Sequence, residues 1–264
     1  MPEEWPAAIP QHGGTAGRNG LRQRVAAATE RLRQPAGRTP ACFVSIRYWD
    51  RRASQRHAEL APVLLVHGYG GSDRMWKPLR AELERAGFDC VIALQYNASR
   101  YGIPQIAEWL VDRAEQSMRA TGIDRVHLVG HSLGGLVVRE AVQRGGLAGL
   151  ASTAVTIATP HLGAGLARFV PGPAARQMCP GSSYLAELDR QDPDRRTRWV
   201  AIAGVSDRVV RTSSAGFAAA GLVTLRQRNA GHGSVARHPE VTAFIAGELL
   251  RAEAPVYQAF SLAA

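Results

Sequence analysis

The sequence has 264 residues, of which 45% are hydrophobic and 20% charged, a composition typical of globular proteins and unlike that of disordered chains. Three cysteines in this length exclude a scaffold built from disulfides, and their spacing does not fit a structural zinc site. The net charge of +10 comes almost entirely from arginine and accompanies no nucleic-acid-binding motif, so we expect no specific nucleic acid partner. No apolar run approaches the roughly 18 residues of a membrane-spanning helix.

Residues 1–40 are predicted to form an Arg-rich tail. Five prolines and a Gly-rich run interrupt regular structure there, although residues 21–33 favour a short basic helix. The acidic start, with no apolar run after it, argues against a secretory signal, so we expect a cytoplasmic location. The tail is typical of a solvated linker and leaves open a weak peripheral contact with a membrane. Residues 42–49 favour a strand or an apolar flap.

From residue 61 onward, short apolar runs alternate with helical patterns. The runs are continuous rather than alternating, which is typical of strands buried on both faces; they cover residues 63–66, 89–94, 126–129, 154–158, 199–203 and 222–225. Helices are predicted over residues 76–86, 103–120 and 133–143, with a last helix from Pro239 to about Arg251. This order indicates a doubly wound α/β fold whose sheet is mostly parallel, with about six core strands.

The strongest local pattern is Gly130-His131-Ser132-Leu133-Gly134, which lies between a predicted strand and a predicted helix. A serine nucleophile has to project from a tight strand-to-helix turn, and Gly130 and Gly134 remove side chains that would collide across such a turn. The helix start favours developing negative charge, and the N–H of Leu133 is a candidate oxyanion donor. The alternative is a structural turn in which Ser132 caps the helix.

A second Gly-rich loop, His67-Gly68-Tyr69-Gly70-Gly71, follows the first predicted strand. An oxyanion hole needs a second backbone donor near this place, and the N–H of Tyr69 is the candidate. The alternative is a plain Gly-rich turn.

A nucleophilic serine needs a base and an acid that orients the base. These groups should come from loops at the carboxyl ends of later strands, because ligands gather at that edge of a parallel sheet. The loop after residues 199–203 offers Asp207, and the loop after residues 222–225 offers His232. The chain order Ser132, Asp207, His232 is the order expected for this architecture.

Other residues compete for these roles. Three alternative acids lie in a polar, Arg-rich stretch that is typical of solvated surface, and they are Asp189, Asp192 and Asp194. The alternative base, His238, precedes a proline at a predicted helix start and is expected to be structural.

Five motifs within residues 61–250 resemble the α/β-hydrolase superfamily and, within it, compact bacterial lipases and esterases. They are Val-His-Gly-Tyr-Gly-Gly (66–71), Val-Gly-His-Ser-Leu-Gly-Gly (129–135), Ala-Thr-Pro-His-Leu-Gly (158–163), Ser-Asp-Arg-Val-Val (206–210) and Ala-Gly-His (230–232). The resemblance implies a catalytic domain over residues 41–264. It also implies the nucleophile Ser132, the base His232, the acid Asp207 and the oxyanion donors Tyr69 and Leu133. His161 is expected to be structural or to line a pocket.

The resemblance implies a serine hydrolase that cleaves carboxylic esters through an acyl-enzyme, with a small-molecule ester or lipid as substrate and without a metal or organic cofactor. Some larger relatives bind calcium near the catalytic histidine, but no acidic cluster follows His232, so we expect no calcium. The Pro- and Gly-rich segment 162–198 is expected to form a short lid or rim. Its apolar residues suit either an acyl chain or ordinary packing.

Other functions stay open at this point. A thioesterase, amidase or acyltransferase would use the same triad, and a binding protein on a hydrolase fold or a membrane-surface adaptor would not use it. The sequence indicates neither the oligomeric state nor the redox state of Cys42, Cys90 and Cys179.

Overall fold

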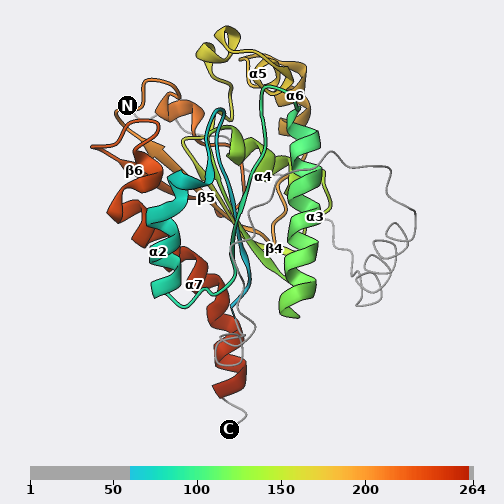
Figure 1. Cartoon of the computed structure of the whole chain (residues 1–264), viewed down its shortest axis with the longest axis vertical. Coiled ribbons are helices and arrows are strands. Elements are labelled where there is room, and N and C mark those ends of the chain that lie inside the picture. Colours follow the sequence, from blue (N-terminus) through green and yellow to red (C-terminus); the bar gives the residue numbers. More distant parts are fainter. Residues whose placement is uncertain (1–59, 262–264) are drawn as a thin grey trace, which may run out of the picture. The chain divides into compact units, whose positions relative to one another are not determined.

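A computed structural model of the protein describes residues 60–261, which contain a six-stranded sheet with helices on both faces (Figure 1). The strand order is β2-β1-β3-β4-β5-β6, and each neighbouring pair is parallel. The strands are β1 (Val63–Val66), β2 (Val91–Leu94), β3 (Val126–His131), β4 (Ala151–Ile157), β5 (Arg198–Gly204) and β6 (Val223–Gln227). The prediction of a doubly wound parallel sheet is confirmed. The predicted tail, its helix and the strand or flap at 42–49 lie outside the described residues.

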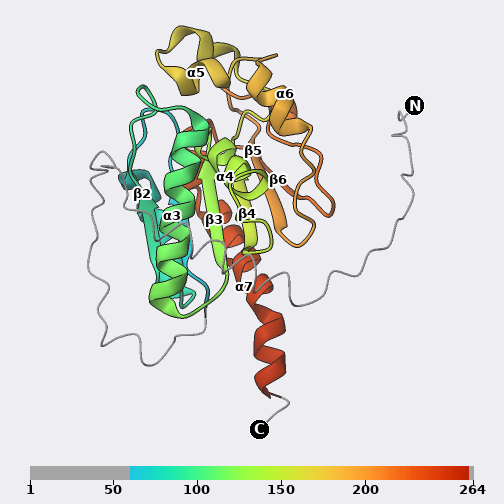
Figure 2. The same cartoon turned by 90° about the vertical axis from the view of Figure 1, so that its right-hand side faces the viewer.

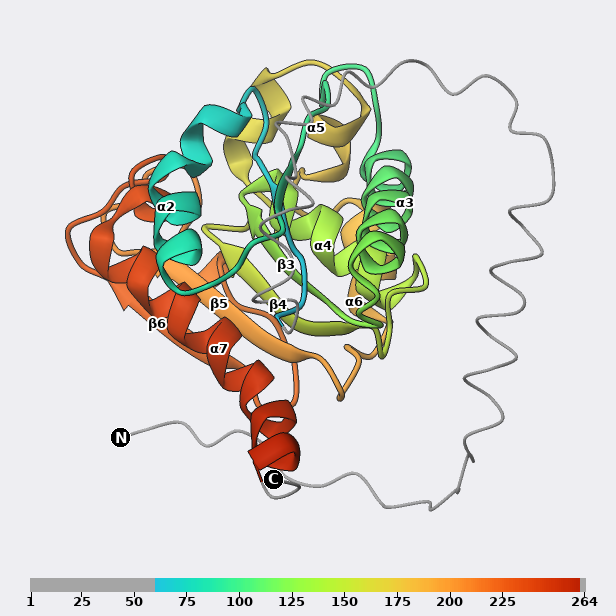
Figure 3. The same cartoon turned by 60° about the horizontal axis from the view of Figure 1, so that its bottom comes forward.

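The helices form two layers and a rim. They are α2 (Lys77–Arg85), α3 (Ile103–Thr121), α4 (Leu133–Gln143), α5 (Pro173–Gln177), α6 (Ser183–Asp189) and α7 (Pro239–Ser261), with short 3-10 helices η1 (Asp73–Trp76), η2 (Gly165–Phe169), η3 (Thr212–Ser214) and η4 (Val235–Arg237). Figure 3 shows α2 and α7 on one face of the sheet and α3 and α4 on the other. Figure 2 shows α5 and α6 together at one end of the sheet.

Successive residues of β1 face different cores, which explains why this strand is apolar throughout. On β1, Leu64 and Val66 pack into the core beneath α3 and α4, whereas Val63 and Leu65 pack into the core beneath α2 and α7. All four side chains are fully buried. A strand buried on both sides has no position that faces solvent, so its sequence loses the alternating pattern of a half-exposed strand.

The predicted end of the last helix was wrong. The helix was expected to end near Arg251, but α7 continues to Ser261. Its extra turns include Glu253, whose carboxylate accepts hydrogen bonds from His127 Nε2 (2.8 Å) and Arg125 Nη2 (2.5 Å) at the start of β3. These bonds join residues more than a hundred positions apart, so helical periodicity could not indicate them.

Glu253→Gln is expected to lower the free energy of unfolding at pH 7 by about 1–3 kcal/mol, because the buried ion pair with Arg125 is lost. Burial opposes ionisation of Glu253, but the hydrogen bonds from His127 and Arg125 outweigh it, so its pKa lies below the ordinary value. Because the pKa is lower in the folded state than in the unfolded state, ionised Glu253 stabilises the fold at pH values above its ordinary pKa. This stabilisation is lost as the pH falls through the pKa of the folded state.

Urea unfolding of wild type and Glu253→Gln should therefore differ at pH 7 and converge as the pH falls below about 4. Glu84→Gln is the matched control, because Glu84 is exposed on α2. Equal losses in the two variants, or a loss for Glu253→Gln that persists at acid pH, would contradict the prediction.

Candidate active site

The structure brings together the three side chains that the sequence singled out. Ser132 lies in the turn from β3 to α4, Asp207 follows β5, and His232 follows β6. The Ser132 hydroxyl lies 3.0 Å from His232 Nε2, and His232 Nδ1 donates to Asp207 Oδ2 at 2.8 Å. Asp207 has a buried side chain, with 1% exposed, and that of His232 is 20% exposed. This arrangement has the geometry of a nucleophile, a base and an acid that orients the base.

The turn at Ser132 has a strained backbone. Ser132 has φ 54° and ψ −121°, in the region that side chains disfavour. Its N–H donates to the Ile157 carbonyl at 2.8 Å, which fixes the turn against β4. A Cβ atom at Gly130 would lie 2.3 Å from the Gly134 carbonyl oxygen, and one at Gly134 would lie 2.1 Å from the Val66 carbonyl oxygen. Only glycine fits at either position.

Gly134→Ala is expected to lower the free energy of unfolding by about 1–3 kcal/mol, because the new methyl group would push α4 away from β1. Gly247→Ala is the matched control, since Gly247 lies in α7 with open space around its Cα. This control should gain about 1 kcal/mol from the better helix propensity of alanine. Thermal unfolding of both variants tests the prediction, and an unchanged midpoint for Gly134→Ala would contradict it.

Asp207 is held by two sets of donors. Its Oδ2 accepts from His232, while its Oδ1 accepts from the N–H groups of Val209 (2.8 Å) and Val210 (2.9 Å). Burial alone would raise the pKa of this carboxyl group, but the hydrogen bonds from His232, Val210 and Val209 outweigh burial and lower it. Asp207 is therefore ionised at neutral pH and fixes the His232 proton on Nδ1.

Of the two predicted oxyanion donors, Leu133 directly follows Ser132 and Tyr69 belongs to a loop that passes close to it. Leu133 is the first residue of α4, so its N–H has no acceptor within the helix. Tyr69 lies in the loop after β1, which passes close to the serine, because a Cβ atom at Gly68 would lie 2.9 Å from Ser132 Cβ. The Tyr69 hydroxyl donates to the Pro171 carbonyl at 2.7 Å and so connects this loop to the 162–198 segment.

Two residues that support this loop were not anticipated from the sequence. His67 Nδ1 donates to the Gly68 carbonyl at 2.8 Å, and the His67 ring stacks on Tyr96 with centroids 4.2 Å apart. The Tyr96 hydroxyl also donates to the His67 carbonyl. Burial lowers the pKa of His67, which keeps its ring neutral. Tyr96 follows β2 outside any recognisable motif, so no sequence pattern could have indicated its contact with the loop.

The alternative acids lie elsewhere. Asp189 accepts from Arg139 Nη2 at 3.0 Å, and Asp192 is exposed. The expectation that Asp194 is solvated was wrong, because its side chain is 10% exposed and accepts hydrogen bonds from the Gly149 N–H (2.5 Å) and the Thr197 hydroxyl (3.2 Å). Its role is to fasten the loop before β4 to the loop before β5.

His161 and His238, the two other histidines considered from the sequence, make contacts outside the triad. His161 is fully buried, accepts from Arg139 Nη1 at 3.3 Å and packs against Phe217 with centroids 4.5 Å apart. Burial, together with the positive charge of Arg139, lowers the pKa of His161 well below its ordinary value. His238 Nε2 lies 3.2 Å from the Gln227 amide nitrogen.

Within residues 60–261, no group of three or more His, Cys, Asp or Glu side chains is placed to hold a metal ion. In the same range, no helix is long and apolar enough to cross a membrane. Cys90 and Cys179 are free thiols, and burial, aided by the charge of Asp89, raises the pKa of Cys90 to about 11. Cys42 lies outside the described residues.

The apolar residues predicted for the 162–198 segment divide into two sets. Met178, Tyr184 and Leu185 are buried and belong to the core. The exposed set comprises Leu162, Leu166, Phe169 and Val170, and their exposed fractions are 58%, 50%, 76% and 38%. We call this exposed set, which lies on and beside η2, the apolar rim.

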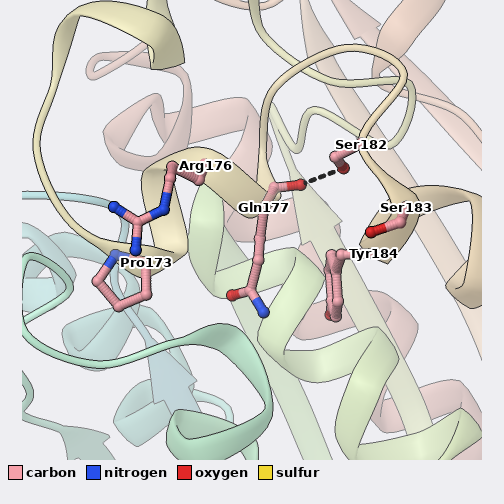
Figure 4. A pocket seen from close by; sticks show the side chains of 6 residues that line it. All are labelled: Pro173, Arg176, Gln177, Ser182, Ser183 and Tyr184. Carbon is pink, nitrogen blue, oxygen red and sulfur yellow. Dashed lines mark hydrogen bonds between the residues drawn. The ribbon is translucent and has the colours of Figure 1, made fainter.

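A pocket of about 290 Å³ lies in the α5–α6 region (Figure 4). It is lined by Pro173, Arg176, Gln177, Ser182, Ser183 and Tyr184. The Ser182 hydroxyl donates to the Gln177 carbonyl at 2.7 Å, and the Tyr184 hydroxyl donates to Glu140 at 3.1 Å. None of the lining residues belongs to the Ser132 site, so this pocket is separate from the triad.

Known proteins share this fold and part of this sequence. Residues 61–175 match the family model described as the alpha/beta hydrolase fold. A triacylglycerol lipase of Burkholderia plantarii is 33% identical over 164 residues, which cover 57% of this chain and 44% of the relative. A triacylglycerol lipase of Pseudarthrobacter phenanthrenivorans is 34% identical over 116 residues, covering 41% and 36%. The chain thus spans less than half the length of these two relatives.

A third relative, from Pantoea ananatis, is named for carbamate hydrolysis and is 38% identical over 87 residues, which cover 31% of each chain. Among solved structures, the mature lipase BlEst2 of Bacillus licheniformis has a TM-score of 0.63 at 16% identity, covering 73% of this chain and 92% of the lipase. The sequence matches, the shared fold and the parallel sheet lead to one conclusion. The chain has an α/β-hydrolase fold and resembles bacterial lipases and esterases.

Proposed function

We propose that the protein is a serine hydrolase that cleaves carboxylic esters with Ser132, His232 and Asp207. The observation that carries the proposal is the hydrogen-bonded series from the Ser132 hydroxyl through His232 to Asp207, with distances of 3.0 and 2.8 Å. A serine hydroxyl is a weak nucleophile until a base at hydrogen-bond distance takes its proton. The relatives named triacylglycerol lipase give independent support for an ester substrate.

In the proposed reaction, His232 Nε2 takes the Ser132 proton while Ser132 Oγ attacks the ester carbonyl. The carbonyl oxygen becomes an oxyanion, which the N–H groups of Tyr69 and Leu133 would stabilise. Asp207 stabilises the resulting imidazolium, which then protonates the alcohol oxygen as the C–O bond breaks. The products of this half-reaction are the free alcohol and an acyl-enzyme. Water, deprotonated by His232, then hydrolyses the acyl-enzyme and regenerates the serine.

The apolar rim favours a substrate with a hydrocarbon chain. It precedes Pro171, whose carbonyl is bonded to the Tyr69 side chain, so the rim borders the proposed oxyanion loop. Four exposed apolar side chains within nine residues form a surface that an acyl chain could cover. We therefore propose that residues 162–198 form the edge of the acyl-binding site and that the substrate is a small-molecule ester or a lipid.

A series of p-nitrophenyl esters with increasing acyl length tests the substrate class, with acyl-thioesters, carbamates and anilides for comparison. We expect hydrolysis of the esters and a kcat/KM that rises with acyl length until the chain covers the rim. Preference for a thioester or an anilide would assign the triad to one of the alternative reactions. The carbamate arm is included because the Pantoea ananatis relative is named for that activity.

A fluorophosphonate probe distinguishes an enzyme from a binding protein on the same fold. The probe reacts covalently with an activated serine, so we expect labelling of wild type that is lost in Ser132→Ala. A wild-type protein that folds but takes up no label would favour the binding-protein alternative.

A further inference from the structure

His131, the residue before the proposed nucleophile, contacts the loop that carries the proposed base. Its Nε2 lies 2.8 Å from the His232 carbonyl oxygen. The His131 and His232 rings pack together, with centroids 4.9 Å apart and an interplanar angle of 49°. His131 is 5% exposed, so this hydrogen bond is shielded from water. The bond joins the end of β3 to the main chain of a residue 101 positions later.

The other edge of the His131 ring faces the oxyanion loop. A Cβ atom at Gly68 would lie 3.1 Å from His131 Nδ1. This nitrogen is buried and has no hydrogen-bond partner among the described residues. A carbonyl oxygen only accepts hydrogen bonds, so the ring proton must be on Nε2, where it is donated to His232. Burial, followed by the charge of His232, lowers the pKa of His131 to about 4, which keeps the ring neutral at physiological pH.

The His232 side chain is bonded to Asp207, whereas the main chain around His232 makes further bonds within its own loop. The Gly231 N–H donates to Ser234 Oγ at 2.9 Å, and the Val235 N–H donates to the Gly231 carbonyl at 3.0 Å. These bonds stabilise the shape of the loop and not its distance from Ser132. The bond from His131 acts on that distance, since its donor belongs to the residue next to the serine.

We propose that His131 is a positioning residue for ester hydrolysis: its Nε2–H holds the His232 main chain where the imidazole meets the Ser132 hydroxyl. This inference rests on the proposed function. It extends that function by giving the variable residue of the Gly-X-Ser-X-Gly turn a role in catalysis. Proton transfer is sensitive to the distance between His232 Nε2 and the Ser132 hydroxyl. A displacement of about 1 Å in a catalytic group can lower the rate by about 10²-fold.

Two amide substitutions at His131 distinguish the effect of its hydrogen bond from the effect of having a polar side chain at this position. His131→Gln places an amide nitrogen near the position of imidazole Nε2, where it can donate to the His232 carbonyl. His131→Asn is one methylene shorter, so its amide falls near the position of Nδ1 and cannot reach that carbonyl. We expect His131→Asn to lower kcat by about 10–10²-fold with little change in KM, and His131→Gln to restore most of the loss.

The rate of fluorophosphonate labelling at Ser132 should follow the same order: wild type, then His131→Gln, then His131→Asn. His127→Asn is the control, because His127 is also buried on β3 and also loses its Nε2 hydrogen bond when shortened to asparagine, but its partner is Glu253 at the opposite end of the strand. That control should lose stability and keep its kcat.

Equal kcat losses in the two His131 variants, or a wild-type kcat in His131→Asn, would overturn the inference while wild-type activity still supported the proposed function. A kcat loss in His127→Asn that matches its loss of stability would also overturn it, by showing that destabilisation alone slows the reaction. A folded wild-type protein with neither hydrolysis nor labelling would overturn both the proposed function and this inference.

Discussion

Ser132→Ala is expected to remove nearly all ester hydrolysis and to leave the fold intact. The substitution deletes the hydroxyl that lies 3.0 Å from His232 Nε2, so no nucleophile remains to form the acyl-enzyme. We expect kcat to fall by about 10⁴–10⁶-fold, as in other serine hydrolases that lose their nucleophile. The backbone should tolerate alanine there, because serine already places a Cβ atom at this φ of 54° and alanine adds no further atom.

The measurements for this prediction are the hydrolysis rate of a p-nitrophenyl ester and the thermal midpoint of unfolding. Ser213→Ala is the control, because Ser213 is an exposed serine in η3, outside the triad and outside the 162–198 segment. Activity near the wild-type level in a pure, folded Ser132→Ala protein would exclude Ser132 as the nucleophile. Equal activity losses in both serine variants would point to a general effect on the protein.

The central sheet could be predicted from the sequence because of how its strands are buried. Residues such as Leu64 and Leu65 face opposite cores, so each strand appears as a continuous apolar run between helices. The turn at Ser132 could also be predicted, because close backbone approaches at Gly130 and Gly134 exclude side chains. In both cases the sequence pattern results directly from the burial or the close approach that it indicates.

The network around Arg139 could not be predicted in the same way. Arg139 lies on α4 with its side chain 2% exposed, and it contacts His161, Asp189 and Phe217 from three separate segments. An arginine in a helix normally indicates an exposed face, and nothing near it in sequence shows that distant residues enclose it. The same reasoning applies to Asp194, which looked solvated because one of its partners, Gly149, belongs to another loop.

Asp207→Asn is expected to lower kcat by about 10⁴-fold. The reason is a change in the tautomer of His232 and not a loss of folding stability. The two oxygens of Asp207 have different partners: Oδ1 accepts from two backbone N–H groups, and Oδ2 accepts from His232 Nδ1. An asparagine has a single oxygen, which should stay with the two N–H groups of Val209 and Val210. Its NH₂ group would then face His232 and donate to Nδ1. The His232 proton would move to Nε2, where it blocks acceptance of the Ser132 proton.

Steady-state kinetics of Asp207→Asn tests this prediction, with Asp189→Asn as the control among the alternative acids. Asp189 bonds to Arg139 and lies outside the triad, so its substitution should affect stability more than kcat. A loss below about tenfold for Asp207→Asn, or a larger loss for Asp189→Asn, would contradict the assignment of Asp207 as the orienting acid.

The combined variant Ser132→Ala/Asp207→Asn shows whether these groups act as one unit. If Asp207 acts only by orienting His232 toward Ser132, it has nothing left to contribute once the hydroxyl is gone. The double variant should therefore be about as active as Ser132→Ala alone, because the effects of residues in one catalytic unit are not additive. Losses that multiply would instead mean that Asp207 contributes to the reaction independently of the serine, and the proposed triad would be incorrect.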